Sequence, residues 1–368
     1  MIPVFEPFTG EEEIAYVTDA LRKGEISGSF GTYLKTFEEK FAAYIGCKHG
    51  VAVTSGTTAL HLAVDAAGIG AGDEVLVSAS TNIATALGVL HNNALPVPVD
   101  SEEVTWNLDL SLIESLITPK TKAIIPVHLF GHPVDMDALM KIARKHHLIV
   151  IEDAAESHGA TVRGRRSGGF GDMGCFSFYA NKVITTGEGG MVVTNDDKLA
   201  ERLRLLRNLA FTQPRFRHEA AGYNFRMTGY QAAMGLAQLE KIDKILFEKR
   251  RVAATYSELL GDVAGLKLPV ELDWAKNVYW MYALTVEPEF GVTRDALMKT
   301  LAEKGIETRT FFCPMNQQQC LQKLPGFSPA PCPVADRIWQ TGLYLPSAPS
   351  LPRETIGHIC DTIKTMRG

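Results

Sequence analysis

Two ionisable side chains follow apolar segments that have the length and composition of buried strands. Residues 148–151 lead to Asp153, and residues 175–179 lead to Lys182. Open α/β sheets bind their ligands just outside the carboxyl ends of their strands, and both side chains fall at such ends. A lysine amine can form a Schiff base with a carbonyl group, and an acid can pair with a protonated ring nitrogen. The two residues together favour a carbonyl-bearing cofactor that draws electrons into a ring.

The same pair also has a purely structural interpretation. Lys182 would then be a surface residue after a core strand, and Asp153 would cap a helix. Paired ionisable groups mark functional sites only as a matter of probability, so the pair alone leaves both interpretations open.

Five short segments, which occur in a fixed order, favour the chemical interpretation. They are Ser55-Gly-Thr-Thr58, Glu152-Asp-Ala-Ala-Glu156, Phe176-Ser-Phe-Tyr179 with Lys182, Gly187-Glu-Gly-Gly190 and Gly222-Tyr-Asn-Phe-Arg-Met227. With them, the chain resembles the DegT/DnrJ/EryC1/StrS family of nucleotide-sugar aminotransferases, which depend on pyridoxal 5'-phosphate (PLP). The resemblance covers essentially the whole chain. It implies an α/β protein of PLP-dependent aminotransferase fold type I, with a large domain and a small C-terminal α+β domain.

The resemblance assigns roles within these segments. Lys182 is expected to be the catalytic residue that carries PLP, and Asp153 is expected to bind the ring nitrogen. The other cofactor-binding residues that we expect are Gly56, Thr57, Glu156, Ser177 and Asn224. The substrate-binding residues that we expect are Ser27, Glu188, Arg226 and Arg309. For Ser27, in a Gly/Ser-rich turn, a surface loop without a ligand is an equal alternative.

Gly56 and Thr57 are expected to bind the phosphate group of the cofactor. They follow a short apolar strand and begin a helical segment. Free N–H groups and the positive end of the helix dipole bind anions at such a point. The alternative is a simple Ser/Thr N-cap, and the other four segments favour the phosphate.

The family resemblance implies transamination, with glutamate as the expected amino donor and a nucleotide-linked keto-6-deoxysugar as the acceptor. Related dehydratases carry His where this chain has Lys182, and a Schiff base needs an amine. The resemblance of three segments, residues 1–4, 185–193 and 309–314, to their counterparts in the family implies GDP-4-keto-6-deoxymannose as the acceptor, aminated at C4. The alternative is a C3 or C4 aminotransferase for a UDP- or dTDP-linked sugar. The resemblance also implies a homodimer in which Asn224 reaches the partner's phosphate site; otherwise Asn224 caps the next helix.

The charge of the substrate points to two arginines. The net charge of the chain is −5, so the diphosphate of a sugar nucleotide must be neutralised locally. The planar guanidinium suits phosphate oxygens, which makes Arg226 and Arg309 the candidates. Each could instead belong to a structural ion pair.

The chain departs from the family pattern at Asn82. The family usually has an aromatic residue here that stacks on the cofactor ring, and an Asn supplies less stacking area. Either a neighbouring side chain covers that face, or the cofactor is held less tightly. Glu156 is expected near the ring hydroxyl, where one of the two groups must hold a proton; the alternative is a solvent-facing Glu. His158 could approach the ring too, but a lone His is more often a hydrogen-bonded structural residue, and we expect the latter.

Composition excludes several other classes of protein. A net charge of −5 and the lack of a basic face argue against nucleic-acid or anionic-membrane binding. No apolar stretch approaches the roughly 20 residues that a membrane helix needs. The N-terminal residues lack the pattern of a signal peptide, and none of the six cysteines forms a Cys-x-x-Cys pair. We therefore expect a cytoplasmic protein without a metal site.

Alternating strand and helix patterns up to residue 151 predict a mainly parallel sheet covered on both faces. A long helical pattern follows over residues 229–260. It has charged residues on its expected outer face, among them Lys249, and it is expected to link the domains and to allow a bend. Beyond residue 261 the segments are short and mixed. We expect a large PLP-binding domain over residues 1–245 and a small domain over residues 246–368.

Overall fold

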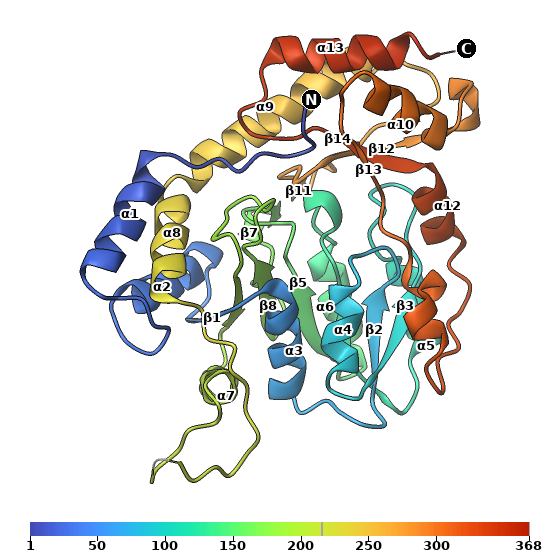
Figure 1. Cartoon of the computed structure of the whole chain (residues 1–368). Coiled ribbons are helices and arrows are strands. Elements are labelled where there is room, and N and C mark those ends of the chain that lie inside the picture. Colours follow the sequence, from blue (N-terminus) through green and yellow to red (C-terminus); the bar gives the residue numbers. More distant parts are fainter. Residues whose placement is uncertain (215, 368) are drawn as a thin grey trace.

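Figure 1 shows the computed structural model, in which a large seven-stranded sheet lies below a smaller four-stranded sheet. It describes residues 1–214 and 216–367. Residue 368, the last of the expected small domain, lies outside the described residues. The strand order of the large sheet is β1-β9-β8-β5-β4-β2-β3, and that of the small sheet is β10-β12-β14-β13.

The strands of the large sheet are short and mostly buried. They are β1 (His49–Val53), β2 (Glu74–Ser78), β3 (Leu95–Val99), β4 (Thr121–Ile125), β5 (Ile149–Asp153), β8 (Met173–Ser177) and β9 (Gly190–Thr194). The small sheet contains β10 (Leu266–Lys267), β12 (Tyr282–Val286), β13 (Arg309–Thr310) and β14 (Gly342–Leu345). A third sheet consists of β6 (Thr161–Val162), β7 (Arg165–Arg166) and β11 (Ala275–Lys276).

The α-helices are α1 (Glu11–Arg22), α2 (Tyr33–Ile45), α3 (Gly56–Ala66), α4 (Ala84–Leu90), α5 (Ile113–Leu116), α6 (Met136–Lys145), α7 (Asp197–Arg207), α8 (Gly229–Glu240), α9 (Ile242–Leu260), α10 (Arg294–Glu303), α11 (Gln319–Gln322), α12 (Pro333–Thr341) and α13 (Arg353–Lys364). Short 3-10 helices occupy Leu110–Leu112, Leu129–Gly131, Pro288–Phe290 and Met315–Gln317.

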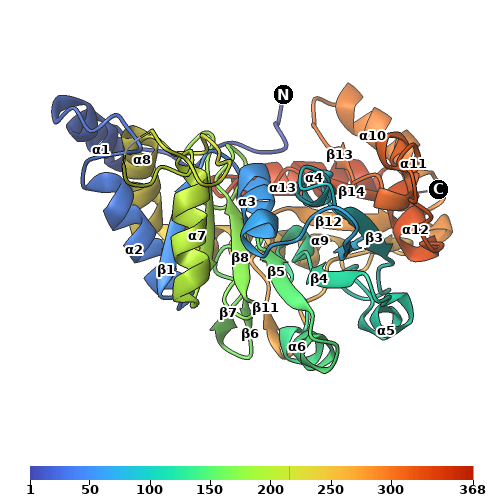
Figure 2. The ribbon, with the colours of Figure 1, turned by 90° about the horizontal axis from the view of Figure 1, so that it is seen from below.

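The large sheet confirms the expected mainly parallel α/β architecture. Strands β3, β2, β4, β5 and β8 pair in parallel, whereas β9 runs antiparallel to both β8 and β1. The side chains of α3, α4 and α7 join one hydrophobic cluster, and those of α2 and α8 join another on the opposite face with part of the same strands. Figure 2 shows α3 and α4 on one side of the sheet and α5 and α6 on the other. Burial of both faces explains why these strands read as continuous apolar runs.

The small sheet is antiparallel and packs against α9, α10 and α13 through a separate apolar cluster. This is the mixed architecture expected beyond residue 261. Helix α9 runs towards this region from the end of α8 (Figure 1). The proposed domain boundary at residues 245–246 falls inside α9 and stays a prediction.

The structure corrects one expectation about the helices. Lys249 does not lie on the outer face of α9, because its side chain is 1% exposed. Its Nζ donates hydrogen bonds to the carbonyl oxygens of Trp280 (2.6 Å) and Ser347 (2.5 Å). The expected bend is a break at Lys241, which ends α8 and precedes α9.

Candidate active site

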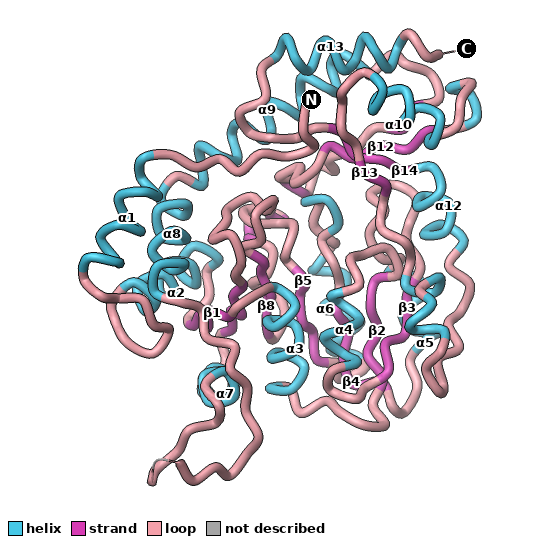
Figure 3. Tube along the Cα trace, viewed as in Figure 1, coloured by secondary structure: helices cyan, strands magenta, loops and turns pink. Residues whose placement is uncertain are grey.

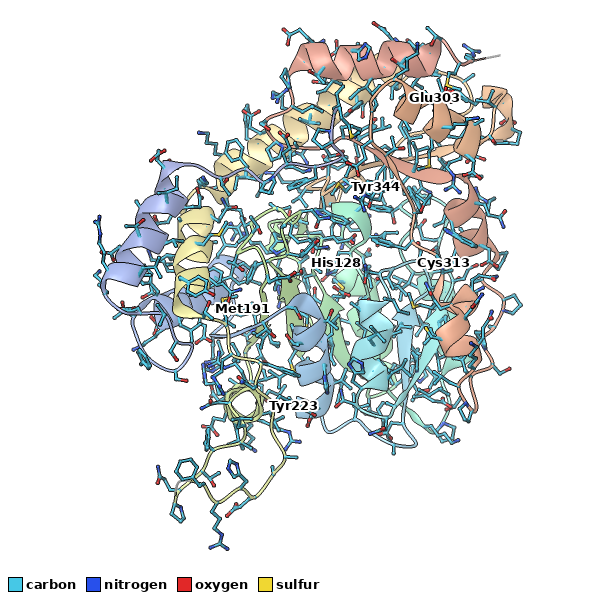
Figure 4. The ribbon with its side chains drawn as sticks, viewed as in Figure 1. His128, Met191, Tyr223, Glu303, Cys313 and Tyr344 are labelled. Atoms are coloured by element: carbon cyan, nitrogen blue, oxygen red, sulfur yellow. The ribbon has the colours of Figure 1, made fainter. Side chains whose placement is uncertain are left out.

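A cleft of about 390 Å³ lies at the carboxyl ends of the large-sheet strands, facing the small sheet. Strands β5 and β8 are parallel neighbours, with Asp153 opposite Cys175, so the residues that follow each strand meet at one edge. Figure 4 labels Tyr344, a residue of β14 in the small sheet, above His128. The residues that line the cleft are Ser55, Gly56, Thr57, Leu60, Thr81, Asn82, Ala84, Val127, Asp153, Ala155, Glu156, Ser177, Tyr179, Asn181, Lys182, Glu188, Trp280, Arg309, Phe312 and Tyr344.

Lys182 lies in this cleft with only 12% of its side chain exposed. A turn after β8 places it, closed by the hydrogen bond from its N–H to the carbonyl oxygen of Tyr179 (2.9 Å). Its Nζ lies 3.8 Å from Oε1 of Glu156. Burial lowers the pKa of Lys182, while the negative charges of Glu156 and Asp153 oppose that shift. Because a larger fraction of the amine is then neutral near pH 7, Lys182 can act as a nucleophile and as a base.

Two buried carboxyl groups accompany the lysine. Asp153 is 5% exposed and accepts hydrogen bonds from Oγ1 of Thr85 (2.8 Å) and from the N–H of Ala155 (3.2 Å). Glu156 is 4% exposed and accepts one from the N–H of Phe130 (2.8 Å). Burial raises the pKa of Asp153, and it raises the pKa of Glu156 to about 7. A cation bound between them would favour their ionised forms.

The start of α3 lines one part of the cleft. Oγ of Ser55 accepts the N–H of Thr58 (3.1 Å), and its carbonyl oxygen accepts that of Ala59 (3.0 Å). The N–H groups of Gly56 and Thr57 therefore have no partner among the described residues, and they lie at the positive end of the helix. The N-cap alternative is thus correct for Ser55 and compatible with an anion at the next two residues.

Gly56 allows this helix start to approach β8 closely. A Cβ added at Gly56 would lie 2.7 Å from Cβ of Ser177 and 3.1 Å from its Oγ. The absence of a side chain thus brings the Ser177 hydroxyl beside the two free N–H groups. Together these groups form an anion site with three potential donors.

A second layer of buried polar groups supports this edge of the sheet. Glu152 accepts hydrogen bonds from the N–H groups of Gly168, Phe170 and Gly171 (2.6–2.7 Å). His128 Nδ1 accepts the N–H of Val134, so its Nε2 carries the proton that it donates to Glu152 (3.1 Å). The sequence pattern predicts no role for this pair or for Thr85. The only sequence feature that points to Glu152 is its place in the segment Glu152-Asp-Ala-Ala-Glu156.

The other expected site residues divide into two groups. Glu188 and Arg309 line the cleft, and Arg309 pairs with Glu307 at 2.8 Å while 59% of its side chain is exposed. The second group does not line it: Ser27, Asn224 and Arg226. These three lie near the start of α8, where the loop before α2 packs against residues 226–229. Arg226 donates to Oδ1 of Asn208 (2.9 Å).

Three further expectations can be compared with the structure. Asn82 lines the cleft, and its Oδ1 accepts a hydrogen bond from the N–H of Ala84. Trp280, Phe312 and Tyr344 are aromatic residues that line the same cleft. Asn224 does not cap α8, because Thr228 is the N-cap. His158 does not line the cleft, and neither ring nitrogen has a hydrogen-bond partner among the described residues, so the expectation of a hydrogen-bonded residue is wrong. His158 is buried against Phe41, Phe176 and Phe178, and burial lowers its pKa to about 3.

These features fit PLP. Gly56, Thr57 and Ser177 would hold the phosphate group, Asp153 would pair with the ring nitrogen, and Lys182 would bind the carbonyl carbon. When bound, PLP supplies a carbonyl that takes up an amine and a ring that accepts electrons from the neighbouring carbon. The buried carboxyl of Asp153 supports this fit most directly, because burial disfavours its ionised form and a protonated ring nitrogen beside it would stabilise that form.

Comparisons with known proteins agree with this site. The family model for the DegT/DnrJ/EryC1/StrS aminotransferase family matches residues 7–364. The GDP-perosamine synthase of Caulobacter vibrioides is 43% identical over 97% of this chain and 96% of its own length. The dTDP-3-amino-3,4,6-trideoxy-alpha-D-glucose transaminase of Streptomyces venezuelae is 38% identical over 99% of this chain and 95% of its own length. The structure of Spr1654 from Streptococcus pneumoniae in its PLP form has a TM-score of 0.93 and 28% identity, covering 100% of this chain and 98% of that one.

The close approach at Gly56 generates a prediction. Gly56→Ala should weaken PLP binding about 5- to 150-fold, because the added methyl group forces the start of α3 away from Ser177 at a cost of about 1–3 kcal/mol. Absorbance titration of the apoprotein with PLP measures the dissociation constant. Gly70→Ala is the matched control, since its added Cβ meets nothing closer than 3.6 Å. An unchanged dissociation constant in folded Gly56→Ala protein would contradict the assignment of the phosphate site.

Proposed function

Because the chain belongs to the DegT/DnrJ/EryC1/StrS aminotransferase family, we propose that it aminates GDP-4-keto-6-deoxymannose at C4 to give GDP-perosamine. The observation that carries the reaction type is the Lys182 amine, buried in the cleft beside Asp153 and Glu156. The observation that carries the substrate is the 43% identity to a GDP-perosamine synthase over nearly the whole chain. Such a product would serve O-antigen or lipopolysaccharide biosynthesis.

In this proposal Nζ of Lys182 takes up and returns the proton of the amino-bearing carbon. Asp153 would keep the ring nitrogen of bound PLP protonated, and the carboxylate of Glu156 lies beside the lysine, where it favours the protonated amine. The depressed pKa of Lys182 allows one group to act first as base and then as acid. Glutamate is the proposed amino donor.

Arg309 is the proposed contact to the substrate's diphosphate. It lines the cleft at its exposed side, where a charged group can stay partly hydrated until the substrate arrives. Glu307 holds the guanidinium and also accepts the N–H of Val4 (3.0 Å), which ties the N-terminal segment to this position. Glu188, which also lines the cleft, is the proposed contact to the sugar.

A homodimer with shared sites accounts for the residues that lie outside the cleft. Asn224 is exposed, Arg226 lies two residues further along the chain, and the loop that carries Ser27 packs against Arg226. The exposed apolar side chains of Ile26, Phe30 and Tyr230 belong to the same loop and helix start. We propose that this surface faces a second copy and supplies Asn224 to the partner's phosphate site.

The proposed compartment is the cytoplasm. Across the described residues no helix is both long enough and apolar enough to cross a membrane. All six cysteines are free thiols, as in proteins of a reducing compartment, and this supports the proposal.

A second candidate is a dTDP- or UDP-linked keto-6-deoxysugar, aminated at C3 or C4. The 38% identity to the dTDP-sugar transaminase favours it. The two candidates share the PLP site, so they differ only in the substrate that the cleft accepts.

A substrate panel tests the proposed substrate. The ratio kcat/KM should be highest for the GDP-linked keto-sugar among GDP-, UDP- and dTDP-linked acceptors. If a UDP or dTDP substrate exceeds it by more than about tenfold, or about 1.4 kcal/mol of transition-state binding, the perosamine assignment is wrong while the aminotransferase assignment stands.

Hybrid dimers test the shared sites. Lys182→Ala and Asn224→Ala proteins, each nearly inactive, should regain about a quarter of wild-type activity after mixing, because half of randomly formed two-fold dimers are hybrids with one intact site in two. Mass spectrometry confirms the hybrids, and mixing two preparations of Lys182→Ala protein is the control. Activity that stays at the parental level despite confirmed hybrids would count against sharing.

A further inference from the structure

Trp280 makes two independent contacts with the segment that carries the lysine. It precedes β12 and is 3% exposed. The Lys182 Nζ lies 3.9 Å from the centroid of its ring. The ring N–H donates a hydrogen bond to the carbonyl oxygen of Asn181 (2.7 Å), the residue just before Lys182. One side chain next to the small sheet therefore contacts both the amine and the backbone of the lysine segment.

We propose that Trp280 is a positioning residue for Lys182: its ring face holds the protonated amine, and its N–H fixes the turn that presents that amine. The proposal rests on the role of Lys182 in the proposed function, because the amine must return to one place each time it is released. Nothing in the sequence pattern had singled out this tryptophan.

The surroundings of the amine explain why a ring face matters. Within the described residues no acceptor lies within hydrogen-bonding distance of Nζ, and Glu156 at 3.8 Å is its nearest charged partner. A cation over an aromatic face is attracted by the ring quadrupole, and a neutral amine is not. The ring therefore stabilises only the protonated form, in a site where burial disfavours it. The other titratable groups that face this part of the cleft are Asp153, Glu156, Tyr179, Glu188, Arg309 and Tyr344, with His158 behind it.

The position of Trp280 is itself held from several sides. Its carbonyl oxygen accepts a hydrogen bond from the buried Nζ of Lys249 (2.6 Å). Its ring lies parallel to that of Phe130, with centroids 6.4 Å apart and 11° between the planes, and Tyr344 is a further neighbour at 6.4 Å. Phe130 also donates its N–H to Glu156, so the same element positions both neighbours of the lysine. Trp280 thus has little freedom to move away from the amine.

The test measures how fast the full-length apoprotein captures PLP at different pH values. In this reaction Nζ of Lys182 forms a C=N bond to the carbonyl carbon, and the carbonyl oxygen leaves as water. Only the neutral amine attacks, so the rate rises with pH, with a midpoint at the pKa of the free lysine. Stopped-flow absorbance follows the capture and needs no sugar substrate.

Trp280→Leu should lower this midpoint by about 0.5–1.5 pH units, the size of a desolvated cation–π contact. The sign follows from the ring favouring the protonated form, so its removal lowers the pKa. Trp280→Met fills more of the space and should shift the midpoint in the same direction. Trp280→Phe keeps a ring face and loses the N–H, so its midpoint should stay near wild type while capture slows several-fold at every pH.

Phe311→Leu is the matched control, because Phe311 is buried in the same aromatic cluster, does not line the cleft and should leave the midpoint unchanged. The proposal is overturned if the Leu and Met variants keep the wild-type midpoint, if the Phe variant shifts as far as they do, or if Phe311→Leu shifts equally. Failure of the wild-type protein to capture PLP would instead refute the role of Lys182. The two failures are therefore distinguishable.

Discussion

The burial of a lysine amine between two carboxyl groups and an aromatic face is the constraint on which the rest of the site depends. An isolated charge in a protein interior is costly unless opposite charges or dipoles compensate for it. Here Glu156, Asp153 and Trp280 provide that compensation without a hydrogen bond that would lock the amine. The amine can therefore exist in both protonation states, which a transamination needs at a single position.

The architecture supplies this environment through strand order. Strands β5 and β8 are adjacent and parallel, so Asp153, Glu156, Ser177 and the lysine segment all leave the sheet at the same edge. Long connections between elements are visible as loops around this edge in Figure 3. The pair of Glu152 and His128 holds the loop that follows β7 through hydrogen bonds to its N–H groups. On the opposite side of the cleft lie Tyr344, from the small sheet, and Trp280, just before β12. Residues from the regions of both sheets therefore line the cleft.

The sequence was sufficient for the residues whose position follows from strand ends and helix starts. Asp153 and Lys182 follow buried apolar runs, and Gly56 and Thr57 begin a helix, so local patterns located them correctly in one cleft. Trp280 and Lys249 were not predictable in this way. Trp280 reaches the lysine from a distant part of the chain, and Lys249 resembles the solvated charges around it although tertiary packing buries it. Ser27, Asn224 and Arg226 lie outside this cleft, and the roles proposed for them would require a second copy of the chain.

The assignment of Lys182 as the residue that binds PLP can be tested by trapping the cofactor. The purified holoenzyme should be reduced with borohydride, digested and analysed by mass spectrometry. We expect a stable pyridoxyl adduct on the peptide that contains Lys182, and no adduct in Lys182→Ala protein treated in the same way. An adduct on another lysine, or protein that binds PLP without any adduct, would show that Lys182 does not bind the cofactor.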